Sequence, residues 1–256
     1  MMDSRSRQLG TLLALTFLAC VTAPPALAQA PNPEPDPKPK DPPLPLIVKL
    51  SDESSLTRWA YAARIVDVRS RHSTRSRRVG RLRFFTEDGF PEVYLALTSY
   101  TTVAGKEWLK IRVPKRPNGV TGWIPADALG ELNENRYQLV INRSLLKATL
   151  FRRRERVWTA RVGIGAPGTE TPAGRFYVRE KFRFSGVPVY GTHAIGTSAY
   201  APTLSDWPGG GVIGIHGTSE PELIPGRPSH GCVRVRNPDV ERLWRKIPIG
   251  TPIWIR

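Results

Sequence analysis

Short runs with the character of β-strands, separated by turn residues, make up most of the sequence between residues 47 and 235. The runs are rich in β-branched and aromatic residues, as in EVYLALTSYT (Glu92–Thr101) and KEWLKIRV (Lys106–Val113). Some alternate apolar with polar side chains, which is typical of a strand with one buried face. A helical period is found only near the C-terminus. The sequence therefore predicts a mostly β protein.

The β-rich region divides into two predicted domains. Residues 47–132 contain several short strands and an Asn118-Gly119 turn, a pattern that favours a small β-barrel. Residues 133–256 begin with three strand-length runs and end with a helix and a strand. The three runs are Tyr137–Asn142, Lys147–Phe151 and Val157–Gly163.

The predicted helix starts in NPDVERLWRK. We expect Asn237 to be its N-cap, Pro238 to occupy the first helical position and Asp239 to lie in the first turn. Its apolar face comprises Val240, Leu243, Trp244 and Ile247.

Residues 1–28 have the order of a secretory signal peptide: basic residues, the apolar run Leu9–Val21, and the small-residue site Ala26-Leu27-Ala28. An alternative interpretation places a lipid on Cys20, because FLAC loosely resembles a lipoprotein cleavage box. In both cases we expect an exported protein, in the periplasm, the cell wall or the extracellular space.

Residues 29–46 have proline at nearly every second position from Pro31 to Pro39. Proline fixes φ and has no amide donor, which excludes a helix or a central strand. We expect an extended linker between the leader and the folded region.

The net charge is +16, and both predicted domains are basic. Such a charge favours an anionic partner, namely nucleic acid, a membrane surface or the anionic polymers of a bacterial envelope. Export argues against nucleic acid. The densest basic segment, Arg69–Arg83, is either a solvated face or a contact for wall polymers.

After removal or lipidation of Cys20, Cys232 is the one free thiol of the mature chain, so an intramolecular disulfide is excluded. A lone thiol outside the cytosol is exposed to oxidation. Cys232 is therefore either a buried, inert residue or a functional one. The residues around it favour function.

A nucleophilic thiol needs a base and a site that stabilises an oxyanion. In IHGTSEPELIPGRPSHGCVRVRN, Cys232 is the candidate nucleophile. His216 is the candidate base, because it ends the apolar strand Val212–Ile215, which would hold it rigidly. The amides of Gly231 and Cys232 are candidate oxyanion donors. Two further residues can orient or donate, Ser229 and His230.

Four His and one Cys remain in the mature chain, with no paired spacing of metal ligands. We therefore expect neither a metal nor another cofactor.

His216-Gly217-Thr218 followed by SHGCVR (Ser229–Arg234) resembles the signature of the L,D-transpeptidase catalytic-domain family. TPAGRFYV (Thr171–Val178) and the terminal helix and strand resemble further family segments, so the match covers roughly residues 134–256. The first domain resembles bacterial SH3-like domains through Trp108 and Gly122-Trp123-Ile124, and we expect both tryptophans in its core.

The resemblance implies an SH3-like β-barrel followed by a β-sandwich-like catalytic domain with one C-terminal helix. It also implies roles for the motif residues. Cys232 is the nucleophile and His216 the general base and acid, oriented by the Gly217 carbonyl. Amides of His230, Gly231 and Cys232 stabilise the oxyanion. Arg234 either supports the site or binds a substrate carboxylate, Tyr190 faces the substrate, and His193 has a local hydrogen-bonding role.

The family members cross-link peptidoglycan through a cysteine acyl-enzyme. By this resemblance, Cys232 opens the amide between the third and fourth residues of a stem peptide, and another stem amine then forms a 3→3 cross-link. Water as acceptor would make an L,D-carboxypeptidase, and a third alternative is a non-catalytic wall-binding protein. Carbapenem-like β-lactams are the implied inhibitors, and we expect a monomer.

Overall fold

The computed structural model describes residues 44–185, 188–205 and 210–256. The predicted signal peptide and nearly all of the predicted linker lie outside these residues, so both stay predictions. Residues 42–256 form one compact unit. It contains two β-sheets, one built from residues 46–135 and the other from residues 137–255.

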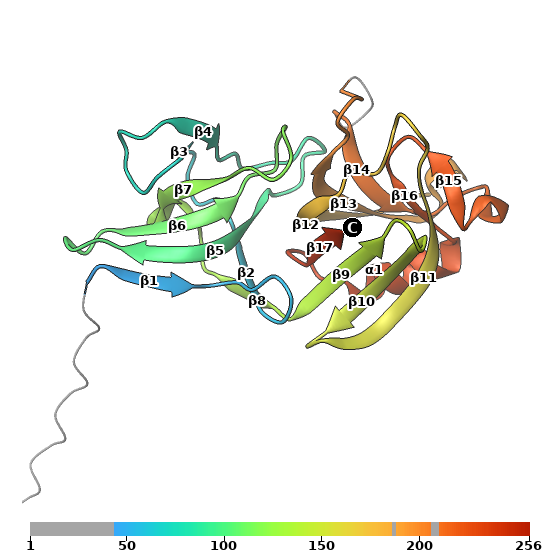
Figure 1. Cartoon of the computed structure of the whole chain (residues 1–256), viewed down its shortest axis with the longest axis horizontal. Coiled ribbons are helices and arrows are strands. Elements are labelled where there is room, and N and C mark those ends of the chain that lie inside the picture. The colour runs from blue at the N-terminus through green and yellow to red at the C-terminus, as the bar shows by residue number, and fades with distance from the viewer. Residues whose placement is uncertain (1–43, 186–187, 206–209) are drawn as a thin grey trace, which may run out of the picture. The chain divides into compact units, whose positions relative to one another are not determined.

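The first sheet has eight strands in the order β4-β3-β7-β6-β5-β2-β8, with β1 added beside β5 (Figure 1). Neighbouring strands in it are antiparallel. β8 follows the predicted domain boundary at residue 132 but still pairs with β2. The strands are β1 (Leu46–Lys49), β2 (Thr57–Tyr61), β3 (Asp67–Arg69), β4 (Arg78–Arg81), β5 (Val93–Thr101), β6 (Glu107–Arg112), β7 (Thr121–Pro125) and β8 (Asn133–Asn135).

Of the two tryptophans expected in the first core, Trp108 is buried and Trp123 is not. The backbone of β7 alternates, so Gly122 and Ile124 point inward and Trp123 points outward. There it packs against His72 and Tyr100. A core position is taken by Gly122, where even a Cβ would lie 2.5 Å from Val68. The prediction for Trp123 is therefore wrong.

The second sheet has nine strands in the order β10-β9-β17-β12-β13-β14-β16-β11-β15, and β10 also pairs with β11. The three runs predicted at its start form β9, β10 and β11. Most pairs are antiparallel, but β14–β16, β17–β9 and β11–β15 are parallel. The strands are β9 (Tyr137–Asn142), β10 (Lys147–Arg152), β11 (Glu155–Gly165), β12 (Gly174–Arg183), β13 (His193–Tyr200), β14 (Val212–His216), β15 (Gly226–Ser229), β16 (Val233–Val235) and β17 (Pro252–Ile255).

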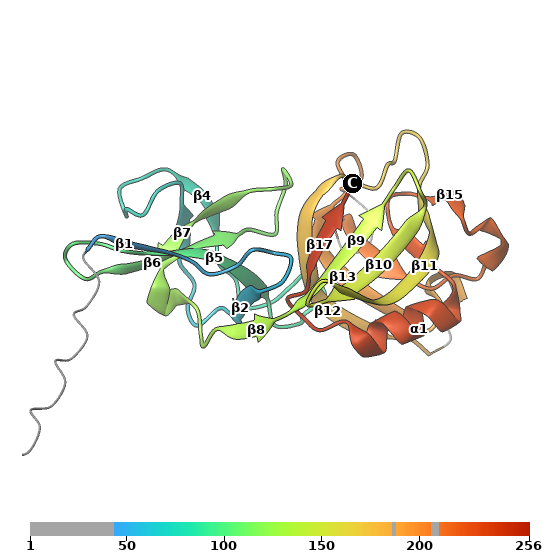
Figure 2. The ribbon, with the colours of Figure 1, turned by 60° about the horizontal axis from the view of Figure 1, so that its bottom comes forward.

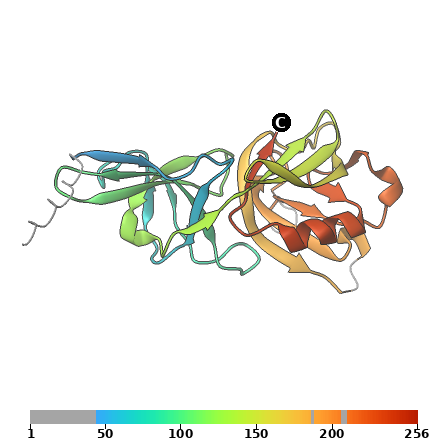
Figure 3. The same ribbon diagram turned by 90° about the horizontal axis from the view of Figure 1, so that it is seen from below.

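Helix α1 (Asn237–Lys246) lies across the outside of this sheet (Figures 2 and 3). Val240 and Leu243 are buried in the core of the second sheet, as expected. The predicted cap is wrong: the N-cap position is Arg236 and has no side-chain cap bond. Among the described residues no helix has the length and hydropathy of a membrane span. Three short 3₁₀ helices complete the secondary structure: η1 (Ala126–Ala128), η2 (Pro188–Tyr190) and η3 (Pro221–Leu223).

A buried ionic network joins the two sheets. Arg179 of β12 is 1% exposed, and its Nε donates to Glu92 Oε1 at 2.8 Å, while Nη2 binds Glu92 and Glu87. Beside it, the Tyr177 hydroxyl donates to the Val93 carbonyl at 2.8 Å. Because a buried charge is costly unless it is paired, the second sheet depends on carboxylates supplied by the first.

Glu180, the next residue on β12, is buried with incomplete hydrogen bonding. Its Oε2 accepts a bond from Thr86 Oγ1 at 2.6 Å, whereas its buried Oε1 has no partner. Desolvation raises the pKa of Glu180 to about 7. The carboxyl group of Glu180 thus binds a proton more tightly in the folded protein than in the unfolded chain.

We expect Glu180→Gln to change how stability depends on pH. The contribution of Glu180 is fully present below pH 4.5, the ordinary pKa of the carboxyl group, and is lost as the pH rises through about 7. The amide of the variant does not titrate, so only wild type loses this contribution as the pH rises. The difference in unfolding free energy, variant minus wild type, should therefore increase by about 2–3 kcal/mol between pH 4.5 and pH 8. Urea unfolding at both pH values measures this difference, with the exposed Glu131→Gln as control. A constant difference would contradict the prediction.

Candidate active site

The parallel pairing of β14 with β16 brings the two candidate catalytic residues together. In this register Ile215 faces Val233 and His216 faces Arg234. His216 is the last residue of β14, and Cys232 immediately precedes β16. The chain between them crosses from the carboxyl end of β14 to the amino end of β16, as parallel strands require.

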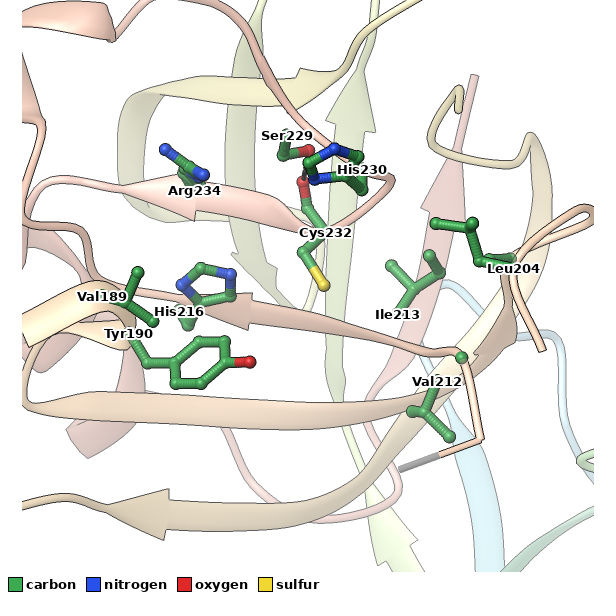
Figure 4. A pocket seen from close by; sticks show the side chains of 12 residues that line it. Val189, Tyr190, Leu204, Val212, Ile213, His216, Ser229, His230, Cys232 and Arg234 are labelled. Carbon is green, nitrogen blue, oxygen red and sulfur yellow. Dashed lines mark hydrogen bonds between the residues drawn. The ribbon is translucent and has the colours of Figure 1, made fainter. Parts of the chain in front are cut away.

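Cys232 and His216 open into one pocket of about 260 Å³ (Figure 4). The imidazole and the thiol face the same space, and Tyr190 lies beside the imidazole. The pocket is lined mainly by apolar side chains, which suits a small number of polar groups acting at low dielectric. Its lining residues are Val189, Tyr190, Ala201, Leu204, Gly211, Val212, Ile213, His216, Ser229, His230, Cys232 and Arg234.

Gly214 separates the two catalytic candidates on the floor of the site. Its amide donates to Cys232 Sγ at 3.4 Å. A Cβ on Gly214 would lie 3.8 Å from His216 Cδ2 and 4.0 Å from Cys232 Sγ. Both groups therefore flank this one backbone position, and the absence of a side chain leaves the space between them open. The predicted strand Val212–Ile215 included Gly214 without assigning it a role.

Burial sets the protonation states of the pair. It raises the pKa of the Cys232 thiol above its usual value, although the Gly214 amide and the charge of Arg234 oppose this. Burial also lowers the pKa of His216 to about 4, against the effect of the Gly217 carbonyl. At neutral pH the site therefore holds a neutral thiol and a neutral imidazole.

His216 is fixed in one tautomer. Its Nδ1 lies 2.6 Å from the carbonyl oxygen of Gly217, and a carbonyl only accepts, so Nδ1 carries the hydrogen. Nε2 is then the unprotonated nitrogen that can take a proton from a thiol. This geometry agrees with the predicted use of the Gly217 backbone.

Asn237 holds the segment that orients His216. Its Oδ1 accepts the Thr218 amide at 2.9 Å, and its Nδ2 donates to the Thr218 carbonyl at 3.0 Å. A Cβ on Gly217 would lie 2.1 Å from Asn237 Oδ1, so only glycine fits this packing. Asn237 is therefore not the expected helix cap, and this contact has no local sequence signal because the two partners are 19 residues apart.

The turn Ser229–Cys232 is closed by its own hydrogen bonds. Ser229 Oγ donates to the Cys232 carbonyl at 2.6 Å and accepts the Gly231 amide at 3.2 Å. Thr171 Oγ1 donates to the Gly231 carbonyl at 2.6 Å. The Gly231 amide is thus engaged inside the turn in this arrangement, and its place in the oxyanion site stays a prediction. Ser229 shapes the turn.

Three other predicted site residues, Tyr190, His230 and Arg234, also line the pocket. Tyr190 stands edge-on to the His216 ring, with 5.0 Å between centroids. Arg234 lines the pocket and forms an ion pair with Glu220 at 2.5 Å, while its buried Nε has no partner.

His193 lies outside the pocket lining, bonded to Thr192 and packed against Trp244, as its predicted local role requires. Within the described ranges, no group of three or more His, Cys, Asp and Glu side chains is arranged to hold a metal ion.

Residues 136–255 match the family model described as the L,D-transpeptidase catalytic domain. Two curated relatives match the same part of the chain. The Bacillus subtilis protein named "Putative L,D-transpeptidase YkuD" is 31% identical over 119 residues, which cover 46% of this chain and 65% of that protein. The Escherichia coli K12 protein named "Probable L,D-transpeptidase YbiS" is 34% identical over 104 residues, covering 38% and 31%.

This chain thus spans less than two thirds of the length of these relatives. Among solved structures, an L,D-transpeptidase from Mycobacterium smegmatis has a TM-score of 0.40 and 13% identity, covering 59% of this chain and 90% of that one. Such a TM-score is too low to establish a common fold. Residues 136–255 are therefore similar in sequence to the L,D-transpeptidase catalytic-domain family and to these relatives.

Proposed function

We propose that this protein is an exported L,D-transpeptidase that forms 3→3 peptidoglycan cross-links through a thioester on Cys232. One observation carries the proposal: His216, locked with Nε2 unprotonated, shares a pocket with Cys232 around Gly214. A thiol that is protonated at neutral pH needs such a base next to it.

In the first step Cys232 Sγ attacks the carbonyl between the third and fourth residues of a stem tetrapeptide, as His216 Nε2 takes the thiol proton. The C–N bond then breaks, the proton passes from His216 to the leaving amine, and a thioester remains. In the second step His216 removes a proton from the acceptor amine of another stem, this amine displaces Cys232 as the C–S bond breaks, and the proton returns from His216 to the sulfur. The energy of the amide is retained in the thioester, so the transfer needs no nucleotide.

The oxyanion of each step requires hydrogen-bond donors, and in this arrangement the Gly231 amide is engaged with Ser229. The Cys232 amide forms no hydrogen bond with another described residue, so it is the best-placed backbone donor in the turn. One backbone donor of this kind commonly stabilises the transition state by about 3 kcal/mol.

Hydrolysis of the same thioester is the alternative, and would make the protein an L,D-carboxypeptidase. The apolar lining of the pocket favours transfer, because it limits the water beside the thioester. We further propose that residues 47–132 form an SH3-like spacing or binding module, and that its basic surface contacts anionic wall polymers.

We expect purified protein incubated with a disaccharide-tetrapeptide to give a cross-linked dimer, detected by mass. Cys232→Ala should lose this product completely, because no second thiol is found among the described residues that line the pocket. Cys232→Ser is a matched control that keeps the shape and replaces the sulfur. Trimmed tripeptide without dimer would support the hydrolase, and unchanged wall chemistry in Cys232→Ala would contradict both enzyme hypotheses.

We expect the rate of acylation of Cys232 to fall only at low pH. His216 acts as a base only when neutral, and burial lowers its pKa to about 4, so the rate should be constant near neutrality and halve near pH 4. Thioester formation with the tetrapeptide, followed by mass between pH 3 and pH 8, measures this. A midpoint between pH 6 and pH 7, the range of an ordinary imidazole, would contradict the lowered pKa of His216.

We expect Asn237→Ala to lower the acylation rate by about ten- to a hundredfold, because the Gly217 carbonyl and with it the His216 ring lose their support. Asn237→Asp keeps the acceptor for the Thr218 amide and adds a negative charge, so its acid midpoint should move above that of wild type. Asp239→Asn, two residues along α1, is the control. Equal rates in Asn237→Ala and wild type would refute the positioning role.

A further inference from the structure

The pocket has two chemically different sides (Figure 4). His216 and Tyr190 lie on one side of Cys232, and Leu204, Ile213 and Val212 lie on the other. We call the second side the apolar wall, defined by Ala201, Leu204, Gly211, Val212 and Ile213. It is formed by the end of β13, the start of β14 and the described residues between them.

Arg116, a residue of the first-sheet half of the chain, holds this wall. It lies in the segment between β6 and β7, and its guanidinium binds three main-chain carbonyls. Nε donates to Ala201 at 3.1 Å, and Nη2 donates to Leu204 at 2.8 Å and to Gly210 at 2.9 Å. Arg116 belongs to none of the ion pairs found among the described residues. Its planar array of donors is therefore committed to the wall.

The segment between β6 and β7 also binds the backbone next to the wall through Asn118. Asn118 Nδ2 donates to the Tyr200 carbonyl at 2.8 Å, and Asn118 Oδ1 accepts the Tyr200 amide at 3.0 Å. The guanidinium of Arg116 also lies over the Tyr200 ring, 4.9 Å from its centroid. The segment thus binds both the end of β13 and the residues that follow it.

Close packing leaves the wall little freedom to shift away from Arg116. A Cβ on Gly211 would lie 2.0 Å from the Leu204 carbonyl oxygen and 2.4 Å from Arg116 Nη2. Gly211 also has φ +75°, a conformation that other residues rarely adopt. The position of the wall is therefore fixed jointly by Arg116 and by the backbone around Gly211.

The chemistry of acyl transfer indicates which part of a substrate this wall contacts. The base that protonates the leaving amine must face it, and the same base must face the incoming amine. Both amines therefore belong on the His216 side of Cys232. The acyl chain, which the sulfur gains in the first step and loses in the second, is left with the opposite side, which is the apolar wall.

We propose that Arg116 is a positioning residue that sets the apolar wall against the acyl chain of the donor, so that donor specificity depends on the first sheet. This inference rests on the proposed function. It requires that loss of Arg116 impair reaction with a long acyl donor while leaving the intrinsic reactivity of Cys232 intact.

The test compares two reactions of Cys232 in full-length protein. The disaccharide-tetrapeptide is the long donor, and iodoacetamide, which alkylates the sulfur with loss of iodide, is a probe too small to need the wall. For Arg116→Ala we expect the second-order rate of thioester formation to fall about ten- to a hundredfold, and the rate of alkylation to change less than about twofold. Arg116→Lys keeps the charge and one donor, so it should lie between Arg116→Ala and wild type.

Lys115→Ala is the matched control, because the neighbouring Lys115 binds the Val79 carbonyl within the first sheet. It should react like wild type with both reagents. Gly211→Ala places a methyl group against both the Leu204 carbonyl and Arg116 Nη2, so it should displace the wall and reproduce the split. It provides a second measurement if Arg116→Ala does not fold. Thermal melting of every variant confirms that folded protein is compared.

Three results would overturn the inference. Unchanged thioester formation in folded Arg116 variants would show that the wall needs no support from the first sheet. An equal fall in both reactions would place the effect on Cys232 itself. A wild-type protein that is alkylated but forms no thioester with the tetrapeptide would overturn the proposed function as well.

Discussion

The site depends on the parallel pairing of β14 with β16. Both strands are short. Their register places His216, the last residue of β14, close to Cys232, which directly precedes β16. Parallel neighbours cannot be joined by a tight turn, so the chain has to leave the sheet after His216 and return before Cys232. That excursion supplies the turn that Ser229 closes and Glu220, which pairs with Arg234. The catalytic geometry is thus a consequence of strand topology.

Desolvation acts in the same direction on both candidate catalytic groups, since it favours the neutral form of each. A preformed ion pair is therefore disfavoured, and in the proposed mechanism the proton moves as the sulfur attacks. The hydrogen bond from His216 Nδ1 to Gly217 makes this possible, because it keeps the other ring nitrogen free to accept. Asn237 supports this arrangement from outside the pocket by holding the Thr218 backbone.

The strand pattern and the His216–Cys232 pair could be predicted because they are local: alternation marks a strand, and a short motif marks a site. The wrong predictions concern the contacts of individual side chains. Asn237 has the residue type and place of a helix cap, yet it binds a backbone 19 residues away. Trp123 has the character of a core residue, but the register of β7 turns it outward. Arg116 carried no local signal, since its carbonyl partners lie about 90 residues along the chain.

Arg179 makes the two sheets one cooperative structure. Its guanidinium is enclosed, and the carboxylates that neutralise it, Glu92 and Glu87, come from the other half of the chain. A fragment holding only the second sheet would carry an orphaned cation and an uncovered Tyr177. The first half of the chain is therefore not exchangeable for an unrelated domain. Any replacement would have to supply two carboxylates at the positions of Glu87 and Glu92.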